Sequence, residues 1–209
     1  MSTPELGDGL QALGLPAEPA ICDRLLRYRD ELARWNRVHN LSGVRDPERM
    51  VAVHLLDSLA LLPLVRGKRL ADIGSGAGLP GLPLALADPE LEVVLVEPRA
   101  KRALFLDHVV RTLAIDNVKV ERSRAQDLSA HPGHETVTAR AFGTLAELIV
   151  AAAHLLQPRG HMLVAKGRDP GAEIAALPAG WTAEVLPLRV PGIEASRHAV
   201  RVYRARAED

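Results

Sequence analysis

Apolar residues in the first third of the chain recur at the spacing that is typical of helices. Residues 20–38 carry one every three or four positions, with arginines between them, which predicts an amphipathic helix. A second such stretch covers residues 46–63, where Asp46 can cap the first turn and Pro63 can end the helix. We therefore expect residues 1–65 to form a helical cap that belongs to the same domain as the rest of the chain.

Short apolar runs replace this pattern from about residue 69 onward. Five of them end at glycine or polar residues, and they alternate with helical stretches near residues 99–114 and 144–156. The five runs are residues 69–74, 92–97, 117–121, 136–141 and 160–167. Strands that alternate with helices form a parallel sheet that is covered on both faces, so the pattern predicts an α/β fold.

Two more apolar runs, residues 181–190 and 197–206, follow a short helical stretch near residues 170–177. No clear helix separates the two runs, so we expect them to form an antiparallel pair at one edge of the sheet. The pattern therefore predicts a seven-stranded, mostly parallel sheet with an antiparallel edge strand. Residues 66–209 form this core, behind the helical cap.

Composition agrees with one globular domain. The chain has 209 residues, of which 47% are hydrophobic and 25% charged, enough to build a sizeable core. No apolar run approaches the ~18 residues of a membrane span, and the first residues lack the basic and apolar regions of a signal peptide. The single cysteine, Cys22, excludes a disulfide framework and a cysteine-rich zinc site. We expect a cytoplasmic protein without a membrane partner or a bound metal.

The charge balance argues against a broad nucleic-acid-binding face. The chain has 26 Lys plus Arg and 26 Asp plus Glu, whereas proteins that bind nucleic acid along a whole face are usually basic. Aromatic residues make up only 3%, which disfavours a stacking platform for single strands. A local basic patch is compatible with this charge balance.

A glycine-rich turn follows the first predicted strand. The segment ADIGSGAGLPG, residues 71–81, places Gly74, Gly76 and Gly78 before a second apolar run. Ligands of open parallel sheets bind at the carboxyl ends of strands, and glycines let the backbone approach them closely. A dinucleotide and S-adenosylmethionine both suit this geometry, and a tight turn without a ligand is the alternative.

Two acidic residues flank this turn. Asp72 lies two residues before the first glycine, where a carboxylate suits a ligand that carries an ammonium and a sulfonium but repels a pyrophosphate. Glu97 ends the next strand, where it can accept both ribose hydroxyls in either cofactor class. Asp72 therefore favours S-adenosylmethionine, with Gly74, Gly76 and Gly78 around it.

The end of the third predicted strand is expected to face the adenine. Backbone groups of Ala125 and Gln126, or the carboxylate of Asp127, could bond the edge of the base. The alternative for Asp127 is an acid that stabilises a helix N-terminus.

Several segments together resemble one protein family. In order they read LARWNRVHNLSGVRDPERMVAVHLLDSLAL, LADIGSGAGLPGLPLA, EPRAKRALFL, SRAQD, ARAF, VAKG and SRHAV. They resemble the bacterial 16S ribosomal RNA guanine-N7 methyltransferases, also called glucose-inhibited division protein B, from about residue 30 to 202. The glycine turn is shared by many methyltransferases, whereas the first segment and the spacing of the last three are much more specific.

The resemblance implies a Rossmann-like class I fold and transfer of a methyl group from S-adenosylmethionine to N7 of one guanine in the 530 loop of 16S rRNA. It also implies cofactor contacts at Gly74, Leu79, Ala125, Gln126 and Arg140. This sequence departs from the family at two positions. Glu97 replaces the Asp of the motif, and Gln126 stands where Glu is common, which puts any role of that Glu side chain in doubt.

Guanine N7 carries a free lone pair, so no base needs to remove a proton before the transfer. Catalysis then consists mainly of holding the base in line with the methyl–sulfur bond and excluding water. Arg140 and Lys166 end two predicted strands and are our candidates for catalytic residues, because each could bind phosphate or guanine O6. Alternatively, either is a charged side chain that reaches solvent at the sheet edge.

Five residues are expected to contact RNA. They are Lys101, Arg124, Lys166, Arg197 and His198. Lys101 and Arg124 match family positions, and so do Asn40 and His54 in the cap. The implied partner is 16S rRNA or the small ribosomal subunit, bound by a monomer. The alternatives are a methyltransferase of the same fold for a small molecule or protein, and a non-catalytic module or dinucleotide oxidoreductase.

Overall fold

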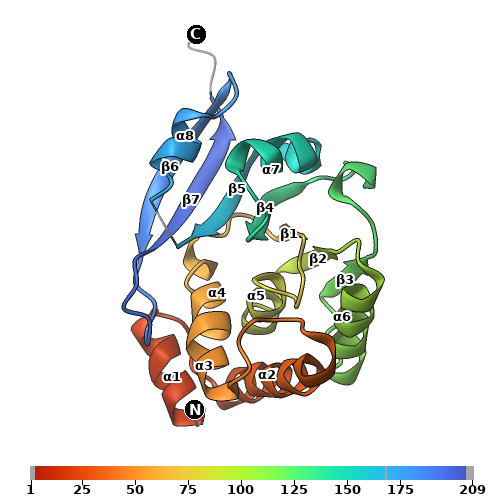
Figure 1. Cartoon of the computed structure of the whole chain (residues 1–209), viewed down its shortest axis with the longest axis vertical. Coiled ribbons are helices and arrows are strands. Elements are labelled where there is room, and N and C mark those ends of the chain that lie inside the picture. The colour runs from red at the N-terminus through yellow and green to blue at the C-terminus, as the bar shows by residue number, and fades with distance from the viewer. Residues whose placement is uncertain (1–2, 168, 206–209) are drawn as a thin grey trace.

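The apolar runs predicted as strands form one seven-stranded sheet. The computed structural model describes residues 3–167 and 169–205. Its strands are β1 (Arg69–Ile73), β2 (Glu92–Val96), β3 (Val118–Glu121), β4 (His134–Arg140), β5 (Leu156–Lys166), β6 (Trp181–Leu188) and β7 (Arg197–Arg204). Their spatial order is β3-β2-β1-β4-β5-β7-β6, so the chain crosses from one half of the sheet to the other between β3 and β4 (Figure 1).

The directions of the strands confirm the prediction of a mostly parallel sheet and show which strand is reversed. The first five strands pair in parallel, whereas β7 pairs antiparallel with both β5 and β6. The reversed strand therefore lies one position in from the edge, and β6 is the edge strand. Because β6 and β7 are joined without a helix, they form the antiparallel pair that the sequence predicts.

Helices cover both faces of the sheet. They are α1 (Thr3–Ala12), α2 (Pro19–His39), α3 (Pro47–Met50), α4 (Asp57–Leu59), α5 (Gly81–Ala87), α6 (Ala100–Thr112), α7 (Leu145–Ala152) and α8 (Gly171–Ala175). The π-helical turn η1 (Val51–Leu56) and the 3₁₀ turns η2 (Leu62–Leu64), η3 (Ala125–Asp127) and η4 (Ala153–Leu155) complete the helical elements of the described residues. Figure 1 shows α1, α2 and the α3–α4 run together at the lower end of the view, with α7 and α8 at the other end.

The second cap helix is less regular than its spacing predicts. Asp46 caps it as expected, because its side chain accepts a hydrogen bond from the backbone N–H of Glu48 at 3.0 Å. The six residues of η1, however, form a π-helical turn, and the N–H of Asp57 donates to the carbonyl of Ala52, five residues back. The spacing of apolar residues does not reveal this wider turn, because five of its six residues are buried and no exposed face marks the helical period. The run ends in the 3₁₀ turn η2, which contains Pro63.

Two apolar clusters hold the layers together. The larger one joins buried cap residues such as Leu25 and Leu59 to Leu82 of α5 and Leu163 of β5. The smaller one packs α7 against the other face of the sheet. The cap and the sheet thus share one continuous core, in which each fully buried leucine contributes about 1.5–3 kcal/mol. Within the described residues, no helix has the length and apolar character needed to cross a membrane.

Candidate active site

The glycine turn crosses the carboxyl ends of β1 and β2. The backbone N–H groups of Gly74 and Ser75 both donate to the carbonyl of Val96, at 2.8 and 3.1 Å. Gly78 has a φ of +90°, and a Cβ there would collide with Leu82 of α5. A residue with a side chain would therefore strain the backbone and push α5 away, which explains the glycine at this position.

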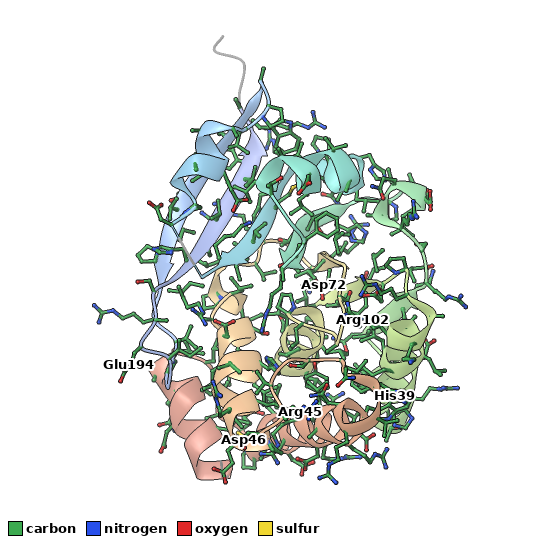
Figure 2. All side chains as sticks on the ribbon, in the orientation of Figure 1. His39, Arg45, Asp46, Asp72, Arg102 and Glu194 are labelled. Atoms are coloured by element: carbon green, nitrogen blue, oxygen red, sulfur yellow. The ribbon has the colours of Figure 1, made fainter. Side chains whose placement is uncertain are left out.

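Asp72 lies beneath this turn and is fully buried. Figure 2 labels the side chain. Its Oδ2 atom accepts a hydrogen bond from the N–H of Gly81 at 3.0 Å, which stabilises the first turn of α5. Burial raises the pKa of Asp72 to about 7, against the lowering effect of that hydrogen bond. Its other oxygen, Oδ1, is buried and accepts no hydrogen bond of good geometry among the described residues, although the nearby Ser75 side chain also lowers the pKa of the carboxyl. The carboxylate thus fixes the turn and keeps one oxygen for a further donor.

Glu97 follows β2 and is 2% exposed. Its two oxygens accept hydrogen bonds from the backbone N–H groups of Gly76 and Arg99, at 3.0 and 2.8 Å. Arg102 of α6 lies 3.8 Å from the same carboxylate (Figure 2). A carboxylate has about four lone-pair positions, so these contacts leave room for hydroxyl donors from a ligand.

These elements enclose a crevice of about 330 Å³ at the carboxyl end of the sheet. Its lining residues are Ile73, Gly74, Val96, Glu97, Pro98, Arg99, Arg102, Arg124, Ala125, Gln126, Ala141 and Phe142. The structure therefore brings together Gly74, Glu97, Ala125 and Gln126 of the predicted cofactor site, with Arg124 of the predicted RNA contacts.

The remaining predicted cofactor residues do not line this crevice. Asp72, Gly76 and Gly78 lie in or beneath the turn that forms its wall, and the side chain of Leu79 is buried in the larger apolar cluster. Any contact between Leu79 and a ligand would have to come from its backbone. Arg140 ends β4 just before the lining residues Ala141 and Phe142.

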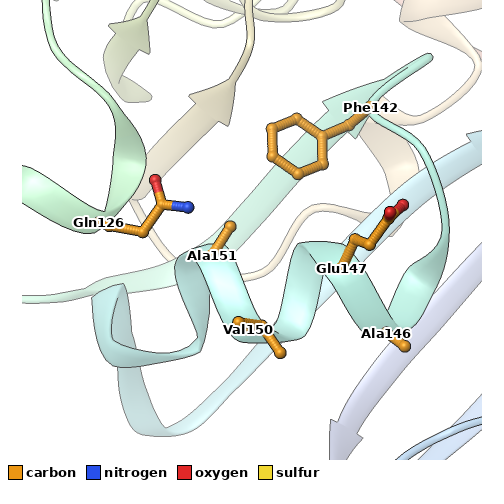
Figure 3. A pocket seen from close by; sticks show the side chains of 6 residues that line it. All are labelled: Gln126, Phe142, Ala146, Glu147, Val150 and Ala151. Atoms are coloured by element: carbon orange, nitrogen blue, oxygen red, sulfur yellow. The ribbon is translucent and has the colours of Figure 1, made fainter.

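Phe142 is a crevice residue to which sequence reasoning assigned no role. Its ring carbon Cδ2 would lie 3.2 Å from a Cβ at Gly74, so the ring packs directly on the glycine turn. Phe142 and Gln126 also line a neighbouring cavity of about 560 Å³, where their side chains point toward each other beside Ala151 of α7 (Figure 3). The sequence offers one signal for Phe142: it is one of two phenylalanines in the chain, and it directly follows a predicted strand.

The two predicted catalytic cations have different surroundings. The Nζ atom of Lys166 donates to both carboxylate oxygens of Glu173, at 2.9 and 2.8 Å, and to the carbonyl of Gly143. Arg140 contacts His54 and Asp57 of the cap, at 3.2 and 3.5 Å. Its Nη1 atom is buried and makes no hydrogen bond within the described part of the chain. Arg140, unlike Lys166, thus keeps a donor that a ligand could use.

The other predicted RNA contacts fall in two places. Lys101 and Arg124 are exposed near the crevice, and neither forms an ion pair with another described residue. Arg197 and His198 begin β7, where His198 lies opposite Lys166 in the ladder. Arg197 donates from Nε to Asp57 Oδ1 at 2.9 Å.

No group of three or more metal-ligating side chains occurs among residues 3–167 and 169–205. The polar groups that line the crevice are the carboxylate of Glu97, the side-chain amide of Gln126 and the guanidinium groups of Arg99, Arg102 and Arg124.

Comparison with known proteins identifies the family. The family described as GidB, rRNA small subunit methyltransferase G, matches residues 21–200. The chain belongs to this family. The resemblance inferred from the sequence motifs is confirmed, as is the prediction that the protein is an enzyme of this class.

Individual relatives match this methyltransferase over nearly their whole length. A ribosomal RNA small subunit methyltransferase G from Xanthomonas axonopodis pv. citri is 51% identical over 195 residues, covering 93% of this chain and 91% of the relative. The protein of the same name from Stenotrophomonas maltophilia (strain K279a) is 49% identical over 198 residues, with coverage of 94% and 92%.

Solved structures support the fold of the methyltransferase. A predicted O-methyltransferase from Agrobacterium tumefaciens superposes with a TM-score of 0.55 at 23% identity, over 73% of this chain and 80% of that one. A precorrin-6y C5,15-methyltransferase from Geobacter metallireducens gives a TM-score of 0.54 at 15% identity, over 71% and 86%. At these identities the likeness shows the fold alone, and it confirms the predicted Rossmann-like class I architecture.

Proposed function

We propose that this methyltransferase transfers a methyl group to N7 of one guanine in the 530 loop of 16S rRNA. As a member of its family, the chain is an S-adenosylmethionine-dependent methyltransferase of small-subunit ribosomal RNA. The choice of guanine N7 in the 530 loop rests on the family motifs in the sequence, and the structural observation that supports it is a cofactor-sized crevice after β1, β2 and β3, with Glu97 in its wall and arginines at its rim.

The residues around the crevice fit the cofactor. We assign the ribose hydroxyls to Glu97 and the adenine edge to Ala125 and Gln126, because all three line the crevice. Asp72 Oδ1 and Arg140 Nη1 are buried groups of opposite charge without hydrogen-bond partners. They complement the ammonium and the carboxylate of an amino acid, because a buried polar atom is stabilised when it gains a partner. The bound cofactor supplies a methyl group on a positively charged sulfur.

The protein's share of the chemistry is to position the guanine. N7 has a lone pair and loses no proton, so the site needs no general base. We assign Arg140 to the cofactor carboxylate or to guanine O6, because it has a buried donor without an acceptor whereas Lys166 is held by Glu173. Phe142 packs on Gly74 and helps to exclude water from the crevice. Orientation and exclusion of water are then the main sources of rate.

Recognition of the RNA is local, because the formal net charge of the chain is zero. We assign Lys101 and Arg124 to phosphate contacts beside the crevice, and Arg197 and His198 to contacts at the start of β7. Lys166, the fifth residue assigned to RNA contacts, would have to exchange its ion pair with Glu173 for a phosphate. The proposed working form is a monomer that acts in the cytoplasm on 16S rRNA or on the small ribosomal subunit.

Methyl transfer to defined substrates tests this function. Naked 16S rRNA, partly assembled particles and mature small subunits, all from a strain that lacks the enzyme, are incubated with tritium-labelled S-adenosylmethionine. Labelled RNA is then treated with borohydride and aniline, which cleave the strand at 7-methylguanine. We expect label in at least one substrate and cleavage at one guanine of the 530 loop. Label confined to protein, or RNA label without cleavage, would overturn the proposal.

A further inference from the structure

Asp57 joins two arginines that come from the two strands next to β5. Its Oδ1 atom accepts a hydrogen bond from Arg197 Nε at 2.9 Å, and its Oδ2 atom lies 3.5 Å from Arg140 Nη1. Arg140 ends β4 and Arg197 begins β7, so the carboxylate of the cap connects strand ends that lie on either side of β5. The Asp57 side chain is only 9% exposed, and a buried charge of this kind needs partners.

The charges of this cluster do not balance. Arg140 and Arg197 share one carboxylate, and among the described residues neither arginine forms an ion pair with any other acid. A further acid nearby is Asp72, whose carboxyl interacts electrostatically with Arg140 without forming an ion pair with it. Arg140 Nη1 is also buried without a hydrogen-bond acceptor, so the cluster is incomplete without a further anionic or carbonyl group.

A histidine holds the other side of Arg140. His54 Nδ1 lies 3.2 Å from Arg140 Nη2, and its Nε2 lies 2.7 Å from Ser42 Oγ. Burial, and next the charge of Arg140, lowers the pKa of His54 to about 4, so the ring is neutral near pH 7. The same Nδ1 atom lies 2.9 Å from the backbone carbonyl oxygen of Val53. A guanidinium can only donate and a carbonyl can only accept, so the neutral ring bonds either Val53 or Arg140 through Nδ1, and Ser42 can donate to Nε2 or accept from it accordingly.

The two cap residues that contact Arg140 lie in and directly after the π-helical turn η1. In a regular helix each residue turns the chain by about 100°, so the wider turn of η1 shifts the direction of the residues that follow it. His54 lies inside the turn and Asp57 directly after it, and both contact Arg140. Wider turns of this kind occur often at functional sites, which fits their position here.

We propose that Asp57 is a positioning residue for methyl transfer, which holds Arg140 toward the cofactor crevice and Arg197 toward the RNA. This inference rests on the proposed function, because it assigns ligands to the two arginines. The cap is then part of the active site, since its carboxylate sets the distance between the two cationic groups. A variant without this carboxylate keeps both arginines in the chain but loses the contact that orients their guanidinium groups.

The test compares Asp57→Asn with Asp46→Asn, a control in the same helical run whose new side chain can still cap the helix. We expect Asp57→Asn to lower kcat/KM for the RNA substrate by about 10-fold to 100-fold, as is typical when a group that orients a binding side chain is lost. The affinity for S-adenosylhomocysteine, measured by calorimetry, should also fall. The control should match the wild type in both measurements.

Binding to unrelated RNA separates positioning from loss of structure. Removal of one carboxylate makes this face more positive, so Asp57→Asn should bind non-specific RNA as tightly as the wild type or more tightly, while kcat falls. A fall of every parameter in proportion to the folded fraction would contradict the proposal. If Asp57→Asn does not fold, Asp57→Glu provides the same comparison, because it keeps the charge and moves the carboxylate by one methylene.

A double-mutant cycle decides whether Asp57 acts through Arg197. Arg197→Gln should cost much less in the Asp57→Asn background than in the wild type, since the two residues act as one unit. Independent effects, or wild-type kinetics for Asp57→Asn, would overturn the proposal. If the wild type itself leaves guanine N7 unmethylated, the proposed function fails, whereas the calorimetric comparison still tests whether Asp57 orients Arg140.

Discussion

Asp72 combines a fixed structural contact with a charge that is sensitive to pH. Its Oδ2 atom holds the N–H of Gly81, and burial raises the pKa of the carboxyl to about 7. The turn can therefore form with the carboxyl in either protonation state near neutral pH. A ligand ammonium beside Oδ1 would favour the ionised form and release the proton.

This coupling predicts that S-adenosylhomocysteine binds more tightly to the wild type as the pH rises from about 6 to 7.5. Asp72→Asn keeps an oxygen that can accept from Gly81 but does not ionise, so its affinity should be lower and nearly constant over that range. Calorimetry at a series of pH values measures both. An equal pH dependence in the two proteins would show that Asp72 does not face the ammonium.

His161 in β5 should contribute to the pH dependence of folding. Burial, and next the charges of Arg201 and Arg66, lowers its pKa from 6.5 to about 4. Below pH 6.5 the unfolded chain therefore takes up a proton that the folded protein does not bind, so stability falls as the pH drops from about 6.5 to 4.

In urea titrations, His161→Gln should lose on the order of 2 kcal/mol less free energy of unfolding between pH 7 and pH 5 than the wild type does. The free energy of unfolding of each protein at pH 5 is compared with its own value at pH 7. A variant whose stability falls as steeply as that of the wild type would exclude His161 as a contributor.

At the scale of elements, helix α2 supports the glycine turn. Tyr28 is fully buried in the larger apolar cluster, and its hydroxyl donates to the carbonyl of Ala77 at 2.7 Å. This bond connects the cap to the loop that follows β1, 49 residues later. The shape of the loop thus depends on a contact far away in the sequence.

Tyr28→Phe should therefore weaken the binding of S-adenosylhomocysteine and lower the free energy of unfolding by about 0.5–1.5 kcal/mol, the usual value of one hydrogen bond. The ring stays buried, so the change removes only the hydroxyl. Tyr203→Phe, at an exposed position of β7, is the matched control and should change neither quantity. Unchanged ligand affinity in Tyr28→Phe would mean that the loop keeps its shape without this bond.

Sequence patterns predict most of the helices and strands, and the part of the site whose residues lie within single short segments. Spacing within one short segment, or a family motif, is enough to predict the strands and the glycine turn. The same holds for the presence of Glu97, Ala125 and Gln126 at the crevice. The π turn η1 and the packing of Phe142 on Gly74 could not be predicted in this way, since they depend on contacts between distant segments. The bridge from Asp57 to Arg197 spans 140 residues, which no local pattern reports.

On the scale of the whole molecule, zero net charge limits RNA binding to a patch. Lys101 and Arg124 are exposed near the crevice without ion pairs to other described residues, whereas Lys68, beyond the amino end of β1, pairs with Glu90. Counterion release makes the affinity for RNA depend on salt in proportion to the number of phosphates that are contacted.

Lys101→Gln and Arg124→Gln should each weaken RNA binding and reduce the slope of log affinity against log salt by about 1. Lys68→Gln removes the same charge at the opposite end of the sheet and should leave the slope unchanged. Fluorescence binding titrations at several salt concentrations measure this difference. Equal slopes for all three variants would place the RNA elsewhere on the surface.

The most direct test of the central claim is mass spectrometry of the 530 loop of 16S rRNA from a bacterium that lacks its own enzyme of this family, with and without the gene for this chain. The account predicts one 7-methylguanine in that loop, present only when the gene is supplied. An unmodified loop in cells that contain the folded protein would contradict it.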